Sequence, residues 1–230
     1  TVFTGKSEHQ IFVLGGNMAV EFDGVNFANG YADGNGGALQ ISSGAWSFTD
    51  CKFSENEAAK NGGAISISGG SLSLENCDFA DNVALNDNVD RTSGNGYGGA
   101  IDSDGAMLSI KGGTFSGNVA WRGGALSIYN CGSEATIRKV TFTDNGNSNT
   151  REGGSIYTEY STKLIGCEMS GSTAMFGAGV YAKSDVTITV YGGTFDNNSS
   201  FGNGGAISAG QDAVLDIKDY NGAPTYFLNN

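Results

Sequence analysis

The 230-residue sequence has little of several residues on which common functions depend. It contains one proline, Pro224, and one histidine, His9, which argues against a proline-rich stalk and leaves little room for histidine-dependent catalysis. No apolar run approaches the roughly 20 residues of a membrane-spanning helix. Basic residues are also scarce, at 12 Lys and Arg against 24 Asp and Glu, so the net charge is −12. Nucleic acids and anionic membranes are bound by clustered Lys and Arg, so we expect no nucleic acid partner and no direct membrane insertion.

Glycine is abundant instead. The chain has 38 Gly, while 39% of its residues are hydrophobic and 10% are aromatic. Disordered chains lack such apolar content, so we expect a buried core. Long helices are disfavoured, because each Gly inside a helix costs about 1 kcal/mol relative to Ala. The composition therefore predicts an all-β chain with many tight turns.

Two short motifs alternate along the chain. The Gly motif is Gly-Gly-Ala followed by an aliphatic residue. It occurs at Gly36 and Gly37, Gly62 and Gly63, Gly98 and Gly99, Gly123 and Gly124, and Gly204 and Gly205, with weaker copies at 153–156 and 177–180. The Phe motif is Phe-x-x-Asn. It pairs Phe53 with Asn56, Phe79 with Asn82, Phe115 with Asn118, Phe142 with Asn145, Phe195 with Asn198 and Phe227 with Asn230, with degenerate copies at Phe27 and at Met169 with Ser172.

The period of the motifs predicts a solenoid. Successive Phe motifs lie mostly 26 or 27 residues apart, which is the size of one supersecondary unit rather than of a domain. Within a unit, apolar residues alternate as in strands, for example Ile65 with Ile67 and Leu72 with Leu74. Three short strands separated by turns describe one coil of a parallel β-helix. We therefore predict a single all-β domain over 1–230, a β-helix of about eight coils.

Each motif has a structural role in such a coil. The paired glycines precede the first inward aliphatic residue, where the backbone turns sharply and needs φ > 0. The Phe points inward and stacks on the Phe of neighbouring coils. The Asn lies at a corner, where it tolerates left-handed geometry and bonds to the backbone or to the next Asn. The arc after the Asn accepts insertions, the largest being 83–97, and inserted loops of solenoids often form the binding face.

The alternation of the two motifs resembles the repeats of the polymorphic membrane proteins, which are passengers of chlamydial autotransporters. Similar repeats occur in large surface proteins of other microbes. The resemblance covers essentially all of 1–230, with the unit at 153–180 and the insertion at 83–97 as departures. It implies a right-handed parallel β-helix that is exported to a surface and has adhesive or surface-display roles.

Candidate binding residues lie near the corner that accepts insertions. The residue three positions after the Asn varies among Ala59, Leu85, Trp121, Met175 and Phe201. Packing on the neighbouring coil is the simpler explanation of these side chains, but an aromatic row at this corner also suits stacking on sugar rings or anchoring of a protein partner. Tyr31, Tyr97 and Phe176 lie near the same corner. On the binding interpretation, the ligand-binding residues are Trp121, Phe176, Phe201 and Tyr97.

Cysteines and acids are the candidates for metal chemistry. Cys51, Cys77, Cys131 and Cys167 show no CxxC spacing, so zinc is not expected. Cys51, Cys77 and Cys167 share an inward face, and buried free thiols fit them better than a disulfide. Asp87, Asp90, Asp102 and Asp104 cluster around the insertion and leave a calcium site open, although solvated surface acids are the better interpretation. We therefore expect no metal and no cofactor.

Catalysis is the main alternative to a binding role, because parallel β-helices also host enzymes that act on polysaccharides. The outward acids expected here are Asp102, Asp104, Glu134, Glu152 and Glu159, with Arg91, Arg122, Arg138 and Arg151. These residues are not expected to share coil positions, as the residues of a cleft built from repeats would. We therefore expect no catalytic residues.

The sequence favours a non-catalytic extracellular or cell-surface module that displays loops on a β-helix rod, for adhesion or assembly. Its expected partners are a protein or a glycan at a surface, with end-to-end self-association through uncapped coils. Two alternatives stay open: a carbohydrate-active β-helix enzyme of the polysaccharide lyase or hydrolase kind, and a calcium-dependent carbohydrate-binding module.

Overall fold

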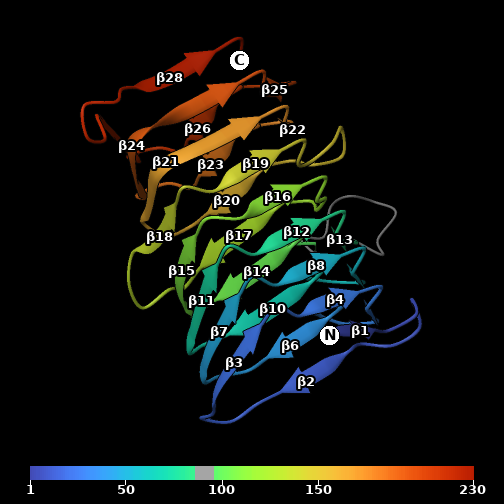
Figure 1. The fold of residues 1–230 in the computed structure, drawn as a ribbon. Helices are drawn as coiled ribbons and strands as arrows, with labels where there is room; N and C mark the ends of the chain where they lie inside the picture. The colour runs from blue at the N-terminus through green and yellow to red at the C-terminus, as the bar shows by residue number, and fades with distance from the viewer. Residues whose placement is uncertain (86–95) are drawn as a thin grey trace.

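Short apolar–polar alternations in the sequence form short parallel strands. The computed structural model describes residues 1–85 and 96–230 and consists there of strands and turns, without a helix. In β11 (Ser71–Glu75), Leu72 and Leu74 are buried and Ser73 is exposed, because successive side chains of a strand point to opposite faces. This strand pairs in register with one strand of the preceding coil and one of the following coil. The coils stack into a rod (Figure 1).

One side of the rod is formed by the strands at the Gly motifs, and we call it the Gly-motif sheet. Within the described residues it has eight strands, and their order in space is their order in the chain: β2 (Phe12–Leu14), β6 (Leu39–Ile41), β10 (Ile65–Ser68), β14 (Ile101–Asp104), β17 (Leu126–Tyr129), β20 (Ile156–Thr158), β23 (Val180–Ala182) and β26 (Ile207–Ala209).

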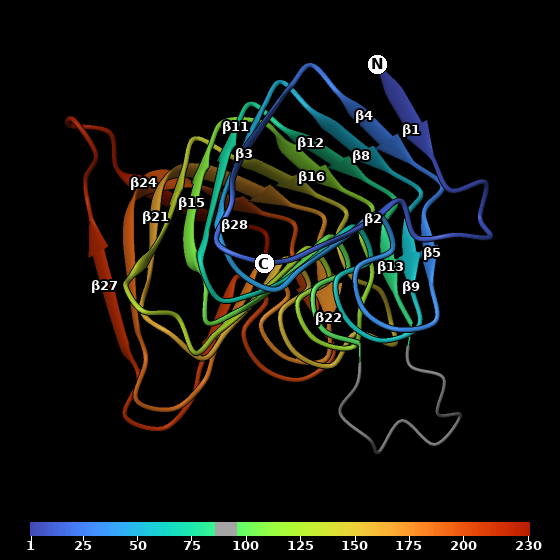
Figure 2. The same ribbon diagram turned by 90° about the horizontal axis from the view of Figure 1, so that it is seen from below.

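The other two sides of the rod belong to one sheet that bends, as the view along the rod shows (Figure 2). The first half consists of β3 (Ala19–Asp23), β7 (Ala45–Thr49), β11, β15 (Met107–Lys111), β18 (Ala135–Arg138) and β27 (Val214–Lys218). The half with the Phe motifs consists of β1 (Val2–Thr4), β4 (Asn26–Ala28), β8 (Lys52–Ser54), β12 (Asp78–Ala80), β16 (Thr114–Ser116), β19 (Thr141–Thr143) and β28 (Thr225–Leu228). Two longer strands, β21 (Thr162–Ser170) and β24 (Thr187–Asp196), run through both halves.

Short strands follow the Asn position in several coils. They are β5 (Tyr31–Ala32), β9 (Glu57–Ala58), β13 (Val83–Ala84), β22 (Thr173–Ala174) and β25 (Ser199–Ser200). The predicted parallel β-helix of about eight coils with a repeat near 26 residues is thereby confirmed. In the described ranges, no helix is long and apolar enough to cross a membrane.

The Phe motif forms the predicted ladder of rings in the core. The centroids of Phe53 and Phe79 lie 4.6 Å apart with 2° between the ring planes, and Phe79 and Phe115 repeat this arrangement at 4.6 Å and 5°. All three rings are fully buried. Met169 occupies the ring position in one coil, and stacking resumes between Phe195 and Phe227 at 4.9 Å.

The Asn of each Phe motif forms a second buried ladder. The side-chain amide of Asn82 donates to the Phe53 carbonyl at 3.0 Å and to Asn118 Oδ1 at 2.9 Å. Its own oxygen accepts from the backbone and side-chain amides of Asn56 at 3.1 and 2.9 Å. The predicted bonds of this Asn to the backbone and to the next Asn are confirmed, but the Asn itself is not left-handed. The preceding residue adopts that geometry, as Glu55 (φ 54°) and Asp81 (φ 55°) show, and the turn there directs the Asn side chain into the interior.

One coil departs from the repeat at two buried positions that face each other. Ser172 stands where other coils have Asn, and Ser155 replaces the Ala of the Gly motif. Their hydroxyl oxygens lie 2.7 Å apart and both residues are fully buried. The two serine hydroxyls therefore satisfy each other's hydrogen-bonding capacity. This bond explains how the degenerate unit at 153–180 keeps its place in the stack.

The paired glycines are required for two different reasons. Gly62, the first of its pair, is left-handed at φ 64°, a conformation that residues with a Cβ rarely adopt. Gly63, the second, is outside that region, but a Cβ there would collide with the backbone of Gly99 and Val83. The second position of the motif therefore requires glycine because the next coil approaches its backbone closely.

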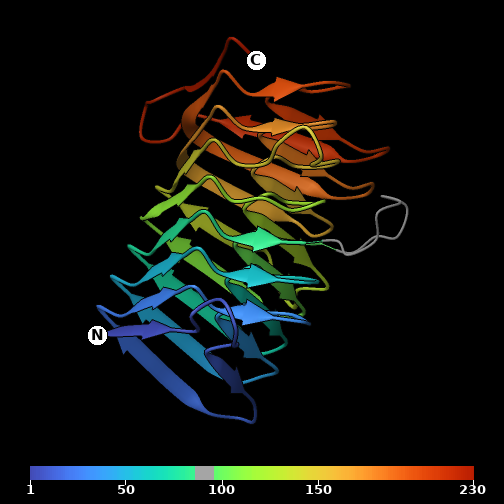
Figure 3. The ribbon, with the colours of Figure 1, turned by 90° about the vertical axis from the view of Figure 1, so that its right-hand side faces the viewer.

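The interior also holds the sulfur atoms and continues to the end of the rod. All four cysteines are buried free thiols, as predicted, and burial raises the pKa of Cys77 to about 12. At the C-terminal end, at the top of Figure 3, Leu215, Ile217 and Phe227 are register partners of buried core residues. Like those partners, the three side chains point toward the interior of the rod. Their exposed fractions are nevertheless 42% for Leu215, 45% for Ile217 and 40% for Phe227.

Candidate functional site

Part of the Gly-motif sheet departs from the repeat. Three outward positions recur in each coil: the residue just before the Gly motif, the residue five positions later, and the residue two positions after that. In three coils they hold small or amide side chains, namely Asn35, Gln40 and Ser42, then Asn61, Ser66 and Ser68, and finally Asn203, Ser208 and Gly210. Four successive coils lie between the coil of Asn61 and the coil of Asn203. In these four coils, the three positions hold almost only aromatic and charged side chains.

We call this surface the tyrosine–arginine face. Its members are Tyr97, Asp102 and Asp104 in the coil of β14; Arg122, Ser127 and Tyr129 in the coil of β17; Glu152, Tyr157 and Glu159 in the coil of β20; and Phe176, Tyr181 and Lys183 in the coil of β23. Ser127 alone keeps a small side chain.

Acids and arginines of this face do share coil positions, so the expectation that they would not is wrong. Tyr97, Arg122, Glu152 and Phe176 are successive partners in a ladder of isolated parallel bridges. Their spacing along the chain is irregular, because the arcs between the Gly motifs differ in length. Counted from the Gly motif, however, all four occupy the same position.

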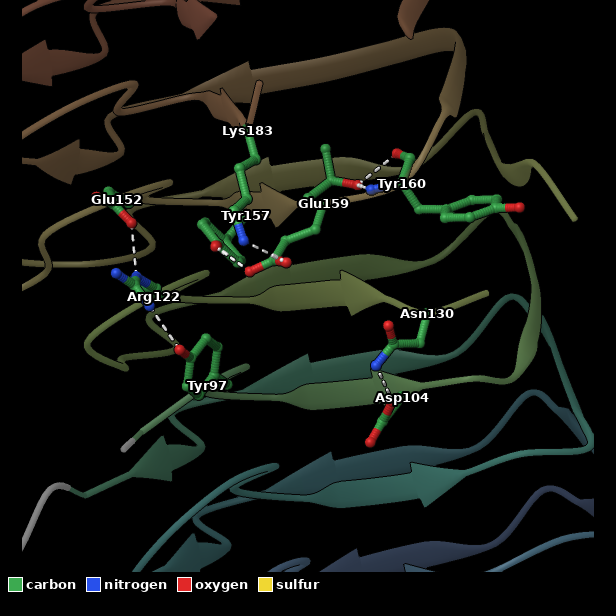
Figure 4. A network of polar contacts seen from close by, with 10 residues as sticks. Tyr97, Asp104, Arg122, Asn130, Glu152, Tyr157, Glu159, Tyr160 and Lys183 are labelled. Carbon is green, nitrogen blue, oxygen red and sulfur yellow. Dashed lines mark hydrogen bonds and ion pairs between the residues drawn. The ribbon is translucent and has the colours of Figure 1, made fainter. Parts of the chain in front are cut away.

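Arg122 lies at the centre of the face (Figure 4). Its Nε bonds to Glu152 Oε2 at 2.5 Å, and its Nη1 donates to the Tyr97 hydroxyl at 2.5 Å. The guanidinium carbon lies 5.4 Å from the Tyr97 ring centroid and 5.3 Å from that of Tyr157, within the range of cation–π attraction. Burial lowers the pKa of Arg122, but the charge of Glu152 and the two tyrosines outweigh it and raise the pKa. The guanidinium is therefore fixed in place and charged.

A second polar group surrounds Glu159. Tyr157 donates its hydroxyl to Glu159 Oε1 at 2.5 Å, and Lys183 Nζ lies 2.7 Å from Glu159 Oε2. Burial raises the pKa of Glu159, but Lys183 and Tyr157 outweigh it and lower the pKa. Glu159 is therefore an ionised carboxylate whose two oxygens are both occupied.

The tyrosine rings form a continuous row. The Tyr97 centroid lies 5.8 Å from that of Tyr129 and 5.9 Å from that of Tyr157, and Tyr157 stacks on Tyr181 at 5.9 Å and 9°. Tyr157 is almost fully buried, whereas Tyr97, Tyr129 and Tyr181 are half-buried. Buried Tyr157 thus holds the partly exposed rings of Tyr97 and Tyr181, and Tyr97 in turn contacts Tyr129.

Asp102 is the unusual acid of the face. The expectation of a solvated surface acid is wrong, because only 2% of Asp102 is exposed. Its Oδ2 accepts from the Tyr129 hydroxyl at 3.1 Å. Ser127 is its register partner and lowers its pKa, yet neither Asp102 Oδ1 nor Ser127 Oγ completes a hydrogen bond. Burial, with the charge of Asp104, raises the pKa of Asp102 to about 8, so the carboxyl is largely protonated at neutral pH.

Glu152, another acid that was expected to point outward, is only 8% exposed, because it packs against Arg122. Asp87, Asp90 and Arg91 lie outside the described residues. Within the described ranges, no group of three or more His, Cys, Asp or Glu side chains is placed to hold a metal.

The residues predicted to bind a ligand lie in two places. Tyr97 and Phe176 belong to the face. Trp121 and Phe201 lie at the neighbouring corner, where Trp121 is half-buried and Phe201 is 66% exposed. The packing interpretation of this corner holds for Ala59, which is buried, but not for Phe201. A binding role for Trp121, Phe176, Phe201 and Tyr97 stays a prediction.

Sequence reasoning named Arg122 only as an outward arginine, and it missed Tyr129, Tyr157 and Tyr181. One signal could have revealed the face. The residue before the Gly motif is Asn in the regular copies at Asn35, Asn61 and Asn203, and it changes to Tyr, Arg, Glu and Phe in the four coils between the last two. In the regular coils this Asn bonds to the next coil, as Asn35 Oδ1 does with the Asn61 amide at 3.2 Å. The four exceptions give up that bond.

Comparison with known proteins agrees with the motifs. Residues 50–68 match the model of the Chlamydia polymorphic membrane protein repeat. This segment contains one Phe motif, at Phe53, and one Gly motif, at Gly62. No curated protein and no solved structure matches the chain. The family match therefore identifies one repeat of the polymorphic membrane protein type, at residues 50–68, within the stacked coils.

Proposed function

We propose that this chain is a non-catalytic adhesion and display module at a cell surface, and that it binds its partner through the tyrosine–arginine face. The repeat family supports the location, since its members are described as membrane proteins. One observation carries the binding role: four successive coils exchange the small residues of the repeat for tyrosine, arginine and carboxylates at three outward positions. Stability of the rod does not need this exchange, because neighbouring coils stack without it.

The composition of the face supports recognition rather than chemistry. Tyrosine and arginine are enriched among the residues that contribute most to binding energy at interfaces. The ionised carboxylates Glu152 and Glu159 are each held in ion pairs, which makes them poor nucleophiles or bases. The rod presents the side chains on paired strands, so little conformational entropy is lost when a partner binds.

The test restores the repeat residues. In the double variant Tyr97→Asn/Tyr181→Ser, each side chain becomes the one that a regular coil carries at the same position, and Tyr226→Ser removes a ring on β28 that is 51% exposed and lies outside the face. Labelled chain should bind saturably to cultured epithelial cells, the double variant should bind about tenfold more weakly, and Tyr226→Ser should match the wild type. Absence of saturable binding, or equal binding by the double variant, would contradict the proposal.

A carbohydrate-active enzyme is the second candidate, and Asp102 is the observation that favours it. A buried, protonated carboxyl beside a second carboxyl, Asp104, is the arrangement of the acid and base in glycoside hydrolysis. Release of reducing ends or unsaturated products from plant and microbial polysaccharides tests this candidate. Turnover that disappears in both Asp102→Asn and Asp104→Asn would favour the enzyme over the binding module.

A further inference from the structure

We infer that the ligand of the tyrosine–arginine face is an uncharged saccharide. This inference rests on the proposed function and narrows the partner from any surface molecule to one chemical class. Three features of the face support it: its balanced charge, its exposed rings, and an unfilled pair of hydrogen-bonding groups beneath them.

The charges of the face are already balanced by one another. Arg122 and Arg151 are both paired with Glu152, and Lys183 is paired with Glu159. Asp104 accepts from the Asn130 side chain at 2.8 Å, and it leaves the β14 end of the face with a single negative charge. An anionic ligand would meet that charge and the net charge of −12 of the chain, and a cationic ligand would have to compete with Arg122 or Lys183 for their carboxylates. An uncharged ligand meets neither cost.

The exposed rings offer flat apolar surfaces on several coils of the face. Tyr97 and Tyr129 stand 5.8 Å apart on adjacent coils, and Tyr181 stacks on buried Tyr157 two coils farther along the rod. Tyrosine supplies rigid contact area together with a hydroxyl, and only two side-chain torsions become fixed on binding. Pyranose rings present an apolar face of C–H groups edged by hydroxyls, which matches this combination.

Asp102 and Ser127 supply the unfilled hydrogen-bonding capacity. A protonated carboxyl and a hydroxyl can each donate and accept, as the hydroxyls of a saccharide can. Asp102 Oδ1 and Ser127 Oγ lack partners although they are buried, and an unpartnered buried polar atom destabilises the fold. Above this pair, the Tyr129 hydroxyl donates a hydrogen bond to Asp102 Oδ2 at 3.1 Å. A ligand hydroxyl that replaces the Tyr129 hydroxyl can therefore bond to Asp102 and add a bond to Ser127.

Other surfaces of the rod do not show this combination. The outer side of the Phe-motif half carries small and polar residues such as Thr141, Thr143 and Ser170, and the exposed ring of Tyr226 in the last coil. The other half of this sheet holds a second cluster of rings and charges, in which Arg138 lies over Tyr220 and Lys218 lies over Tyr191. Among the residues that the structure describes, the tyrosine–arginine face alone joins such a cluster to a buried carboxyl with an unpartnered oxygen.

The test is a glycan array probed with the intact chain. The array carries neutral oligosaccharides built from glucose, galactose and mannose, together with sialylated and sulfated glycans. Three variants accompany the wild type: Tyr97→Asn/Tyr181→Ser, Ser127→Ala, and Tyr226→Ser as the matched control outside the face. A thermal melt of each variant confirms that it is folded.

We expect binding to neutral glycans that falls about tenfold in the double variant, because two aromatic contacts are lost. We expect a severalfold fall for Ser127→Ala and no change for Tyr226→Ser. Binding to sialylated or sulfated glycans alone, or neutral binding that the double variant keeps, overturns the inference. If cells are bound through the face and no glycan is bound, the saccharide is excluded and a protein partner remains. If neither cells nor glycans are bound, the proposed function fails as well.

Discussion

Asp102 should make the rod less stable as the pH rises. Its pKa is raised from 3.8 to about 8 in the folded chain. Between these values the folded state binds more protons than the unfolded state, so the free energy of unfolding falls with increasing pH. Each unit of pKa difference corresponds to about 1.4 kcal/mol. The loss therefore develops between about pH 4 and 8 and reaches at most about 4 kcal/mol at pH 7.

The variant Asp102→Asn removes the titration and keeps the shape of the side chain. We expect its stability to exceed that of the wild type by an amount that is small at pH 4.5, grows with pH and is constant above pH 8. Urea unfolding at pH 4.5, 6, 7 and 8.5 measures this difference, with the fluorescence of buried Trp46 as the signal. Asp104→Asn controls for the loss of one negative charge on the same strand.

The result that would refute the reasoning is a parallel pH dependence of wild type and Asp102→Asn. A variant less stable than the wild type at pH 8.5 would refute it as well. If the expected difference appears, Asp102 is a residue that costs the rod stability at neutral pH. Residues of this kind are found mostly at functional sites, so the stability measurement also bears on the role of the face.

Three further predictions concern the core and the end of the rod. Phe79→Ala should lower the free energy of unfolding by about 3–5 kcal/mol, because the ring is buried between two others, whereas Phe201→Ala at an exposed ring should change it by less than about 0.5 kcal/mol; equal melting temperatures would contradict the register of the coils. The four cysteines should not react with a thiol reagent in the native chain and should react in urea, because burial raises their pKa, for Cys167 to about 11; rapid native labelling would show that the interior is open. We propose that the chain self-associates through its C-terminal end, so Ile217→Lys/Phe227→Lys should shift sedimentation toward the monomer, and a wild type that is monomeric at all concentrations would exclude this contact.

The fold could be predicted from the sequence because every coil repeats the same physical requirements. A left-handed glycine, a glycine without room for a Cβ, a stacking ring and a bonding Asn recur at fixed positions, as Gly62, Gly63, Phe79 and Asn82 show. In a parallel stack, one correct register fixes the neighbours on both sides. Even the degenerate coil obeys this register, because its two serines bond to each other.

The face could be predicted only in part, because it depends on contacts between coils. Tyr97 and Phe176 stood out as aromatic residues near a corner, but the ladder that joins them runs through Arg122 and Glu152. The burial of Asp102 is caused by its surroundings in the stack, where the hydroxyl that covers it comes from Tyr129 of the next coil. Motif spacing predicts which residues share a position in successive coils. It does not predict which side chain contacts and buries the side chain of the neighbouring coil.

The most direct test of the tyrosine–arginine face as the binding site compares affinity and stability in the same variant. The dissociation constant for cells and the melting temperature are measured for the wild type and for Tyr97→Asn/Tyr181→Ser. The account predicts about tenfold weaker binding by a rod that melts within a few degrees of the wild type. Equal affinity in a folded double variant would contradict it.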